Sequence, residues 1–172
     1  MTLLKNRYVT TRALETSRQL ALCTQCGDIH YKGFWYSSDS QFAQLIDEER
    51  DVINSQRCPA CEMENRGSFA GVLAVRHVPE DMLIPVFSVI RRAVEQDSEE
   101  NPQHRVLGVS AENDGYTLKT TSANMVRRIA RKILDAYEVS EAKSTYKKEP
   151  ELIRTTNIVF AIPGFFSHRI TK

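Results

Sequence analysis

The segments Cys23-Thr24-Gln25-Cys26-Gly27 and Cys58-Pro59-Ala60-Cys61 contain all four cysteines of this 172-residue chain. Two residues stand between the cysteines of each pair, and 31 residues stand between the pairs. A C-x2-C segment folds as a tight turn that directs both sulfurs at one ion, and two such turns supply four soft thiolate ligands. Gly27 fits the turn, because the residue after the second cysteine often needs a positive φ. The spacing therefore predicts a structural Zn²⁺ site formed by Cys23, Cys26, Cys58 and Cys61.

Disulfide bonds and a redox-active cysteine pair are the alternatives to a metal site. Paired cysteines two residues apart favour metal binding over disulfides in a reducing compartment. We expect a cytoplasmic location, because Met1–Arg7 lacks the apolar core and cleavage site of a signal peptide. Four thiolates also complete the coordination shell and leave no position for a substrate, which argues against a catalytic metal. His30, close to the first pair, is expected to be a surface hydrogen-bonding residue.

The separation between the two pairs exceeds the ~15–20 residues that are usual in a zinc ribbon, which predicts an insertion. A short helix is expected over Ser40–Asn54, because its apolar residues fall on one helical stripe. These residues are Phe42, Leu45, Ile46 and Ile53. Residues 1–66 are therefore expected to form a zinc-ribbon domain with a helical insertion.

The segment Tyr31-Lys32-Gly33-Phe34-Trp35-Tyr36 interleaves aromatic side chains with one cation on an expected hairpin of the ribbon. Packing is the more common role for such aromatics, because a ribbon with a small core needs cover around its metal. The functional alternative is RNA binding, in which Trp35 or Tyr36 stacks on bases and Lys32 contacts phosphate.

The chain after Cys61 contains no further cysteine and alternates between strand and helix patterns. Helices are expected after Pro79, which suits the first position of a helix, and after a cap at Thr121 or Ser122. Asn113-Asp114-Gly115 predicts a hairpin turn. Strands are expected at 69–76, 105–111, 116–121, 139–147 and 153–162. The order β-α-β-β-α-β, with one additional terminal strand, predicts a ferredoxin-like α+β domain over residues 67–172.

The second expected helix has an apolar face and a basic face. The apolar face contains Val126, Ile129, Ala130, Ile133, Leu134 and Tyr137, and the basic face contains Arg127, Arg128, Arg131 and Lys132. Between Lys119 and Lys148 there are eight basic and three acidic residues. A solvated helix face is the default explanation, and phosphate contact by the four cations is the functional alternative.

Composition and motifs restrict the class of protein. The chain is 41% hydrophobic and 26% charged, with 23 basic and 22 acidic residues, which describes a globular protein and not a disordered tail. No apolar run approaches the ~20 residues of a membrane span. The sequence has no glycine-rich nucleotide loop, nucleophile elbow or HExxH motif. His77, His104 and His168 have no neighbouring nucleophile, so we expect no catalytic activity.

The order of these pieces resembles the N-terminal part of the nonsense-mediated-decay protein three family, the export adaptors of the large ribosomal subunit. The residues that carry the resemblance are the cysteine pairs, the segment 66–76 (RGSFAGVLAVR), the segment 113–116 (NDGY), the basic helix with Ala123 and Ala130, and the segment 154–163 (RTTNIVFAIP). The chain looks similar to a short, stand-alone prokaryotic relative, so nuclear export is not expected. The resemblance implies association with RNA or a ribosomal subunit.

Two functional hypotheses follow. The first is a non-catalytic zinc-binding adaptor that associates with RNA or ribosomal particles through Lys32, Trp35 and the basic helix face. The alternative is a zinc-stabilised protein–protein interaction module without nucleic-acid binding, which would use the acidic first helix and an exposed edge strand. Salt separates the two, because phosphate contacts weaken steeply as salt rises and an apolar interface barely responds.

Overall fold

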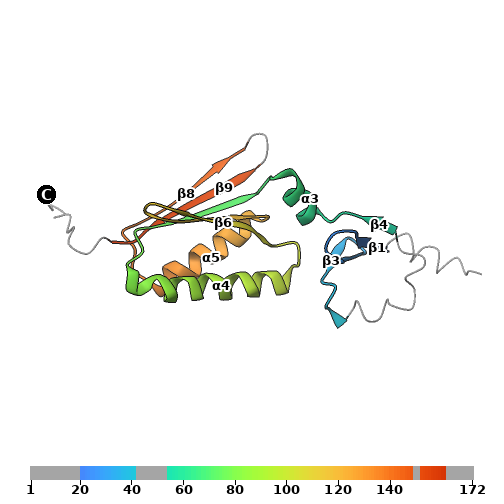
Figure 1. Cartoon of the computed structure of the whole chain (residues 1–172), viewed down its shortest axis with the longest axis horizontal. Coiled ribbons are helices and arrows are strands. Elements are labelled where there is room, and N and C mark those ends of the chain that lie inside the picture. Colours follow the sequence, from blue (N-terminus) through green and yellow to red (C-terminus); the bar gives the residue numbers. More distant parts are fainter. Residues whose placement is uncertain (1–19, 42–53, 149–151, 162–172) are drawn as a thin grey trace, which may run out of the picture. The chain divides into compact units, whose positions relative to one another are not determined.

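The computed structural model describes residues 20–41, 54–148 and 152–161 of the chain (Figure 1). The chain divides into two compact units, Met1–Glu62 and Met63–Lys172. This division falls inside helix α3 (Pro59–Arg66), whereas the boundary predicted from the sequence follows residue 66. No helix in the described part of the chain has the length and apolar character needed to cross a membrane.

The first unit contains a four-stranded mixed sheet in the order β3-β2-β1-β4. The antiparallel pairs are β1–β2 and β2–β3, and β4 runs parallel to β1. The strands are β1 (Leu20–Cys23), β2 (Ile29–Tyr31), β3 (Phe34–Tyr36) and β4 (Asn54–Gln56). The helical insertion that we expected over Ser40–Asn54 lies almost entirely in residues 42–53, outside the described residues.

The expected ribbon hairpin is present as the β2–β3 pair. Its connection has two residues, Lys32 and Gly33, with φ angles of 48° and 87°. Two consecutive positive φ angles match the right-handed twist of the flanking strands, and glycine adopts such an angle without a steric cost. The turn therefore fixes which side chains lie at the hairpin tip.

The second unit contains a five-stranded mixed sheet in the order β6-β7-β5-β9-β8. Its elements in chain order are β5 (Gly71–Arg76), the 3-10 turn η2 (Glu80–Met82), α4 (Leu83–Glu100), β6 (Val106–Glu112), β7 (Gly115–Thr120), α5 (Ala123–Ala136), β8 (Glu141–Lys147) and β9 (Ile153–Val159). The predicted fold class is confirmed: the chain is α+β, with an N-terminal four-cysteine ribbon followed by the β-α-β-β-α-β order and one additional strand.

The additional strand lies inside the sheet and not at its edge. β9 pairs with β5 in parallel and with β8 in antiparallel, so β8 becomes the outer strand. Thr156 and Ile158 of β9 are buried beside Leu73 and Val75 of β5, whereas every residue of β8 is exposed. The more apolar strand therefore occupies the inner position, where it buries its side chains.

Helices α4 and α5 cover the same face of this sheet (Figure 1). The core between the layers contains Leu73, Val75, Leu118 and Ile158 from the sheet, Val86, Ile90 and Ala93 from α4, and Met125, Val126, Ile129, Ala130 and Ile133 from α5. Ser122 caps α5, because its side chain accepts from the Met125 N–H at 3.4 Å. One expectation was wrong: Leu134 is 42% exposed, because it lies beyond the edge of the buried stripe.

Candidate metal centre

The four cysteine sulfurs of the first unit converge on one point. All four Sγ atoms lie within 4.8 Å of one another, and those of Cys26 and Cys58 are 3.7 Å apart. A tetrahedral ion with metal–sulfur distances of about 2.3 Å places its ligand sulfurs about 3.8 Å from one another. Cys23, Cys58 and Cys61 are at most 2% exposed, and Cys26 is half-buried. The cluster can therefore hold one metal ion away from solvent.

The first pair is shaped by a turn at the end of β1. The Gly27 N–H donates to the Cys23 carbonyl at 3.0 Å, and the Cys23 N–H donates to the Asp28 carbonyl at 2.8 Å. Gly27 has a φ of 78°, as its position after the second cysteine predicted. This backbone conformation brings Cys26 back toward Cys23.

The second pair is shaped by the start of α3. Pro59 is the first residue of this helix, where proline fits because the first N–H groups of a helix have no intrahelical acceptor. Cys58 precedes the helix and Cys61 lies in its first turn, so both sulfurs lie at the same helix end. The Glu62 N–H donates to the Cys58 carbonyl at 2.9 Å and closes the turn.

Backbone N–H groups point at two of the sulfurs. The Cys58 N–H donates to Cys23 Sγ at 3.3 Å, and the Cys61 N–H donates to Cys58 Sγ at 3.4 Å. Burial alone would raise the pKa of Cys23, but hydrogen bonds from the backbone of Cys26, Cys58 and Gln25 outweigh it and lower this pKa from 9.0 to about 6. Burial raises the pKa of Cys61, and its contacts with the neighbouring sulfurs raise it further. Of these two residues, Cys23 is thus the one whose surroundings favour the thiolate that a metal ion requires.

The described part of the first unit has a small apolar core. Besides the cysteines, its buried hydrophobic residues are Leu20, Ala21, Ile29 and Ala60. The half-buried Trp35 packs against the cysteine cluster and extends this core. Domains of about 60 residues have small cores in general, so a bound metal ion would contribute directly to the folding of this unit.

The hairpin tip differs from the expected RNA-binding arrangement. Trp35 packs against the cysteine cluster, and its ring centroid lies 5.1 Å from that of His30. The exposed aromatic side chain is instead Phe34, which is 68% exposed. Lys32 Nζ lies 5.0 Å from the centroid of the Tyr31 ring. Phe34 was not among the predicted RNA-binding residues, although neighbouring side chains of a strand lie on opposite faces, so that only one of Phe34 and Trp35 can pack against the cluster.

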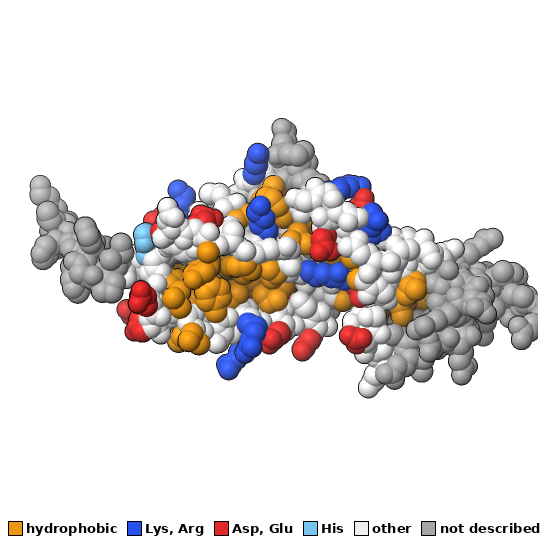
Figure 2. Space-filling view, viewed as in Figure 1, with side chains coloured by type: hydrophobic (Ala, Val, Ile, Leu, Met, Phe, Trp, Pro, Cys, Tyr) orange, Lys and Arg blue, Asp and Glu red, His pale blue; other side chains and the backbone are white. Residues whose placement is uncertain are grey.

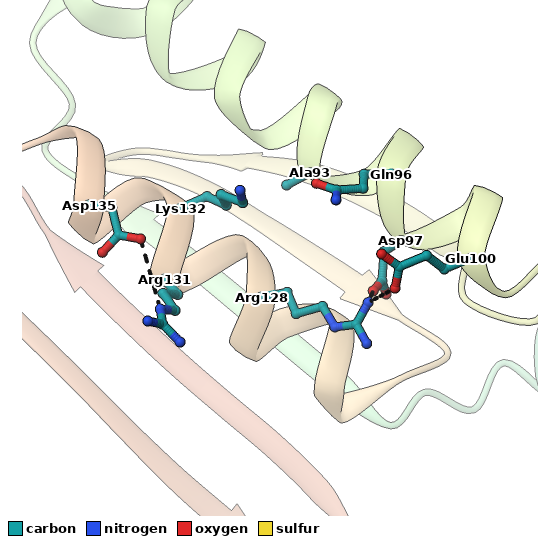
Figure 3. A pocket seen from close by; sticks show the side chains of 8 residues that line it. All are labelled: Ala93, Gln96, Asp97, Glu100, Arg128, Arg131, Lys132 and Asp135. Atoms are coloured by element: carbon teal, nitrogen blue, oxygen red, sulfur yellow. Dashed lines mark hydrogen bonds and ion pairs between the residues drawn. The ribbon is translucent and has the colours of Figure 1, made fainter.

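The basic face of α5 is divided by acidic residues. Arg128 Nη1 lies 2.5 Å from Asp97 Oδ1 and also contacts Glu100, so Arg128 joins α5 to α4 (Figure 3). The hydrogen bond that Arg128 donates to Glu100 and the charge of Asp97 raise the pKa of Arg128 above its ordinary value. Arg131 is 83% exposed, with its Nε 3.9 Å from Asp135 Oδ2.

Lys132 and Arg127 complete the predicted basic face. Lys132 extends toward α4 and lines a cavity of about 500 Å³ between the two helices, together with Arg128 and Arg131 (Figure 3). Arg127 is exposed. The four cations therefore do not act as one uniform positive strip, because Arg128 is already engaged by two carboxylates.

Comparison with known proteins gives no assignment: no protein-family model matches the chain, and a search of curated proteins finds no match. The resemblance to the nonsense-mediated-decay protein three family stays a prediction.

Proposed function

We propose that the four-cysteine centre binds Zn²⁺ and that the chain is a non-catalytic adaptor that binds RNA, either free or within ribosomal particles. The observation that carries this proposal is the β2–β3 hairpin, which presents the exposed Phe34 ring two residues from Lys32 on a module in which four cysteine sulfurs converge. Four soft thiolates suit zinc, and they leave the ion no open position for chemistry.

The hairpin has the two features that single-stranded RNA binding requires. An exposed aromatic ring stacks on an unpaired base, and a neighbouring cation contacts phosphate. Trp35 lies on the opposite side of β3 and packs against the cysteine cluster, so the metal centre supports the strand that carries Phe34. In this arrangement Trp35 has a supporting role, and Phe34 replaces it as the stacking residue.

The cations of α5 have a secondary role in the proposal. Arg127, Arg131 and Lys132 add electrostatic attraction that does not depend on sequence. Arg128 is left out, because Asp97 and Glu100 neutralise its charge. We also propose a cytoplasmic location, where thiols stay reduced and RNA is present.

The test is a fluorescence anisotropy titration of a short, mixed-sequence single-stranded RNA with zinc-loaded protein. Elemental analysis first establishes whether about one zinc is bound per chain. Phe34→Ala should weaken RNA binding by about 5- to 150-fold, because stacking contributes about 1–3 kcal/mol per base. Tyr146→Ala is the matched control, since Tyr146 is also an exposed aromatic residue, 56% exposed, but lies in the second unit. Equal affinities for the wild type and Phe34→Ala would refute the assignment.

A salt series tests the role of Lys32. The slope of log affinity against log salt should fall by about 0.7 in Lys32→Gln, which is the value for one lost contact on single-stranded nucleic acid. An unchanged slope would remove Lys32 from the interface.

The alternative function is a protein–protein interaction module that does not bind nucleic acid. Exposed apolar side chains on α4 and β6, Ile84 and Val109, favour it. Complete absence of RNA binding, together with partner capture that persists at high salt, would support this alternative over the adaptor.

A further inference from the structure

The two edges of the second sheet differ in their protection against pairing. β8 carries Glu141, Lys143 and Lys147, and charged side chains on an edge strand discourage another strand from adding to it. β6 contains Gly108-Val109-Ser110-Ala111, which has no charged residue and is exposed at every position. Among the described strands, β6 pairs only with β7, so its outer edge has free backbone groups. β6 is therefore the edge that is open to a further strand.

Apolar surface lies beside this open edge. Val109 is 58% exposed and Ile84 of α4 is 80% exposed. Hydrophobic side chains form a continuous patch between α4 and the sheet (Figure 2). A cavity of about 520 Å³ in this region is lined by Leu83, Ile84, Phe87, Ser88, Arg91 and Tyr116. Free backbone groups and exposed apolar side chains therefore occur together.

The apolar floor of the cavity includes Tyr116 of β7, the strand that pairs with β6. The rings of Phe87 and Tyr116 pack edge to face with centroids 4.7 Å apart, and Tyr116 is directly opposite Ala111 in the β6–β7 pair. Val109 is opposite Leu118, which is buried under the helices. Side chains on directly opposite positions share a face, so Val109 and Ala111 lie on the helix-covered side of the sheet.

We infer that the outer edge of β6 pairs in antiparallel with β6 of a second copy of this chain, so that two five-stranded sheets join into one. The pairing is centred on Ser110, which faces Ser110 of the second copy. It buries Val109 and Ile84 of both copies. This inference concerns the second unit alone and does not depend on RNA binding by the hairpin of the first unit.

The sequence of β6 is complementary to itself in this register. Val109 faces Ala111 of the second copy, so two apolar side chains meet on the helix side. Glu112 faces Gly108 of the second copy, so the acidic residue at the end of the strand does not meet a like charge. The register shift between Val106 and Gly108 ends the regular part of the strand at Gly108, which limits the pairing to five residues.

A second copy also explains why the apolar side chain of Ile84 on α4 is exposed in the single copy, because the dimer would bury it. A two-fold axis perpendicular to the sheet leaves both α4 helices on the same face of the joined sheet. Ile84 of each copy then lies on the same side of the joined sheet as the two contacts between Val109 and Ala111. A foreign strand would pair with the backbone of β6, but it would not bring a second Ile84 to cover Val109.

Sedimentation equilibrium of the full-length, zinc-loaded chain tests the inference over a series from low micromolar to several hundred micromolar. The apparent mass should rise from 19.6 kDa toward twice that value. Val109→Lys should keep the chain monomeric throughout, because a lysine would be buried opposite Ala111 with no acidic partner. Val109 is exposed in the single copy, so the circular dichroism and the melting temperature of this variant should match those of the wild type at low micromolar concentration, where both are monomeric. Thr145→Lys in β8 is the matched control and should leave the dimer intact.

Three results would overturn the inference. These are a wild type that stays monomeric at every concentration, a dimer that persists in Val109→Lys, and a dimer that Thr145→Lys disrupts equally. Hydrogen exchange of the backbone amides of residues 108–112 shows whether something other than a second copy covers the outer edge of β6. Slow exchange in a monomer would mean that another part of the same chain covers the edge, and it also contradicts the inference.

Discussion

Arg128 of α5 and Asp97 of α4 form an ion pair between the two helices of the second unit, with Arg128 Nη1 2.5 Å from Asp97 Oδ1. The Asp97 side chain is 1% exposed, and its second oxygen lies 2.8 Å from His104 Nδ1. A buried carboxylate needs such partners, because an unpaired charge in the interior is costly. Arg128 is therefore a structural residue, although the sequence alone suggested a role in phosphate contact.

Replacing the buried acid should destabilise the second unit. Asp97→Ala removes the shared partner of Arg128 and His104, and we expect the free energy of unfolding to fall by about 2–4 kcal/mol. Urea denaturation measures this change. Asp135→Ala is the matched control, because Asp135 is 67% exposed and pairs with Arg131, which is 83% exposed. This control should change stability by less than about 0.5 kcal/mol. Equal stability of the wild type and Asp97→Ala would show that the pair contributes nothing.

Removal of the metal should unfold the first unit and leave the second folded. The second unit has its own core between the sheet and the two helices, whereas the first has few buried apolar residues in its described part. Nuclear magnetic resonance spectra recorded with excess chelator should lose the dispersed signals of residues 20–36 and keep those of β5 and α5. Cys61→Ser should have the same effect without chelator. Preserved signals for both units after zinc removal would rule out a structural metal.

Zinc affinity should fall as the pH is lowered from about 8 to about 6, because thiols must lose their protons to bind the ion. The lowered pKa of Cys23, about 6, makes this residue a thiolate over most of that range. Cys61 has a raised pKa and remains a thiol, so binding must release its proton. Competition with a chromophoric chelator measures the affinity, and a weakly buffered solution reports the released protons. A pH-independent affinity would contradict this assignment of protonation states.

Local patterns were sufficient to predict the strands and the two long helices of the second unit and the four cysteines that cluster in the first, but they did not indicate helix α3. The spacing of each cysteine pair predicts a tight turn. The capping residue Ser122 and the apolar stripe after it predict the start and the buried face of α5. Which of Phe34 and Trp35 is exposed for base stacking was harder to predict. Both are aromatic, and they differ only in that one lies on the buried face of the strand and the other on the exposed face. The sequence gives no rule that selects that face without knowledge of where the cysteine cluster lies.

Long-range relationships were not predictable from the same patterns. Asp97 and Arg128 are 31 positions apart, and nothing local to either one indicates the pair. The inner position of β9 likewise depends on a competition between β8 and β9 for the edge of β5. Alternation identifies both segments as strands, but it does not state their order in the sheet.

The inner position of β9 also constrains how the second unit is assembled during protein synthesis. β5 leaves the ribosome first, and its parallel neighbour follows only after both helices and three other strands have been made. Until then Leu73 and Val75 lack one flank, and β8 lacks its partner among the described strands. Closure of the sheet is therefore a late event that joins distant parts of the chain, which is the kind of step that slows folding. A nascent chain stalled before Ile153 would expose the flank of β5 to any strand nearby.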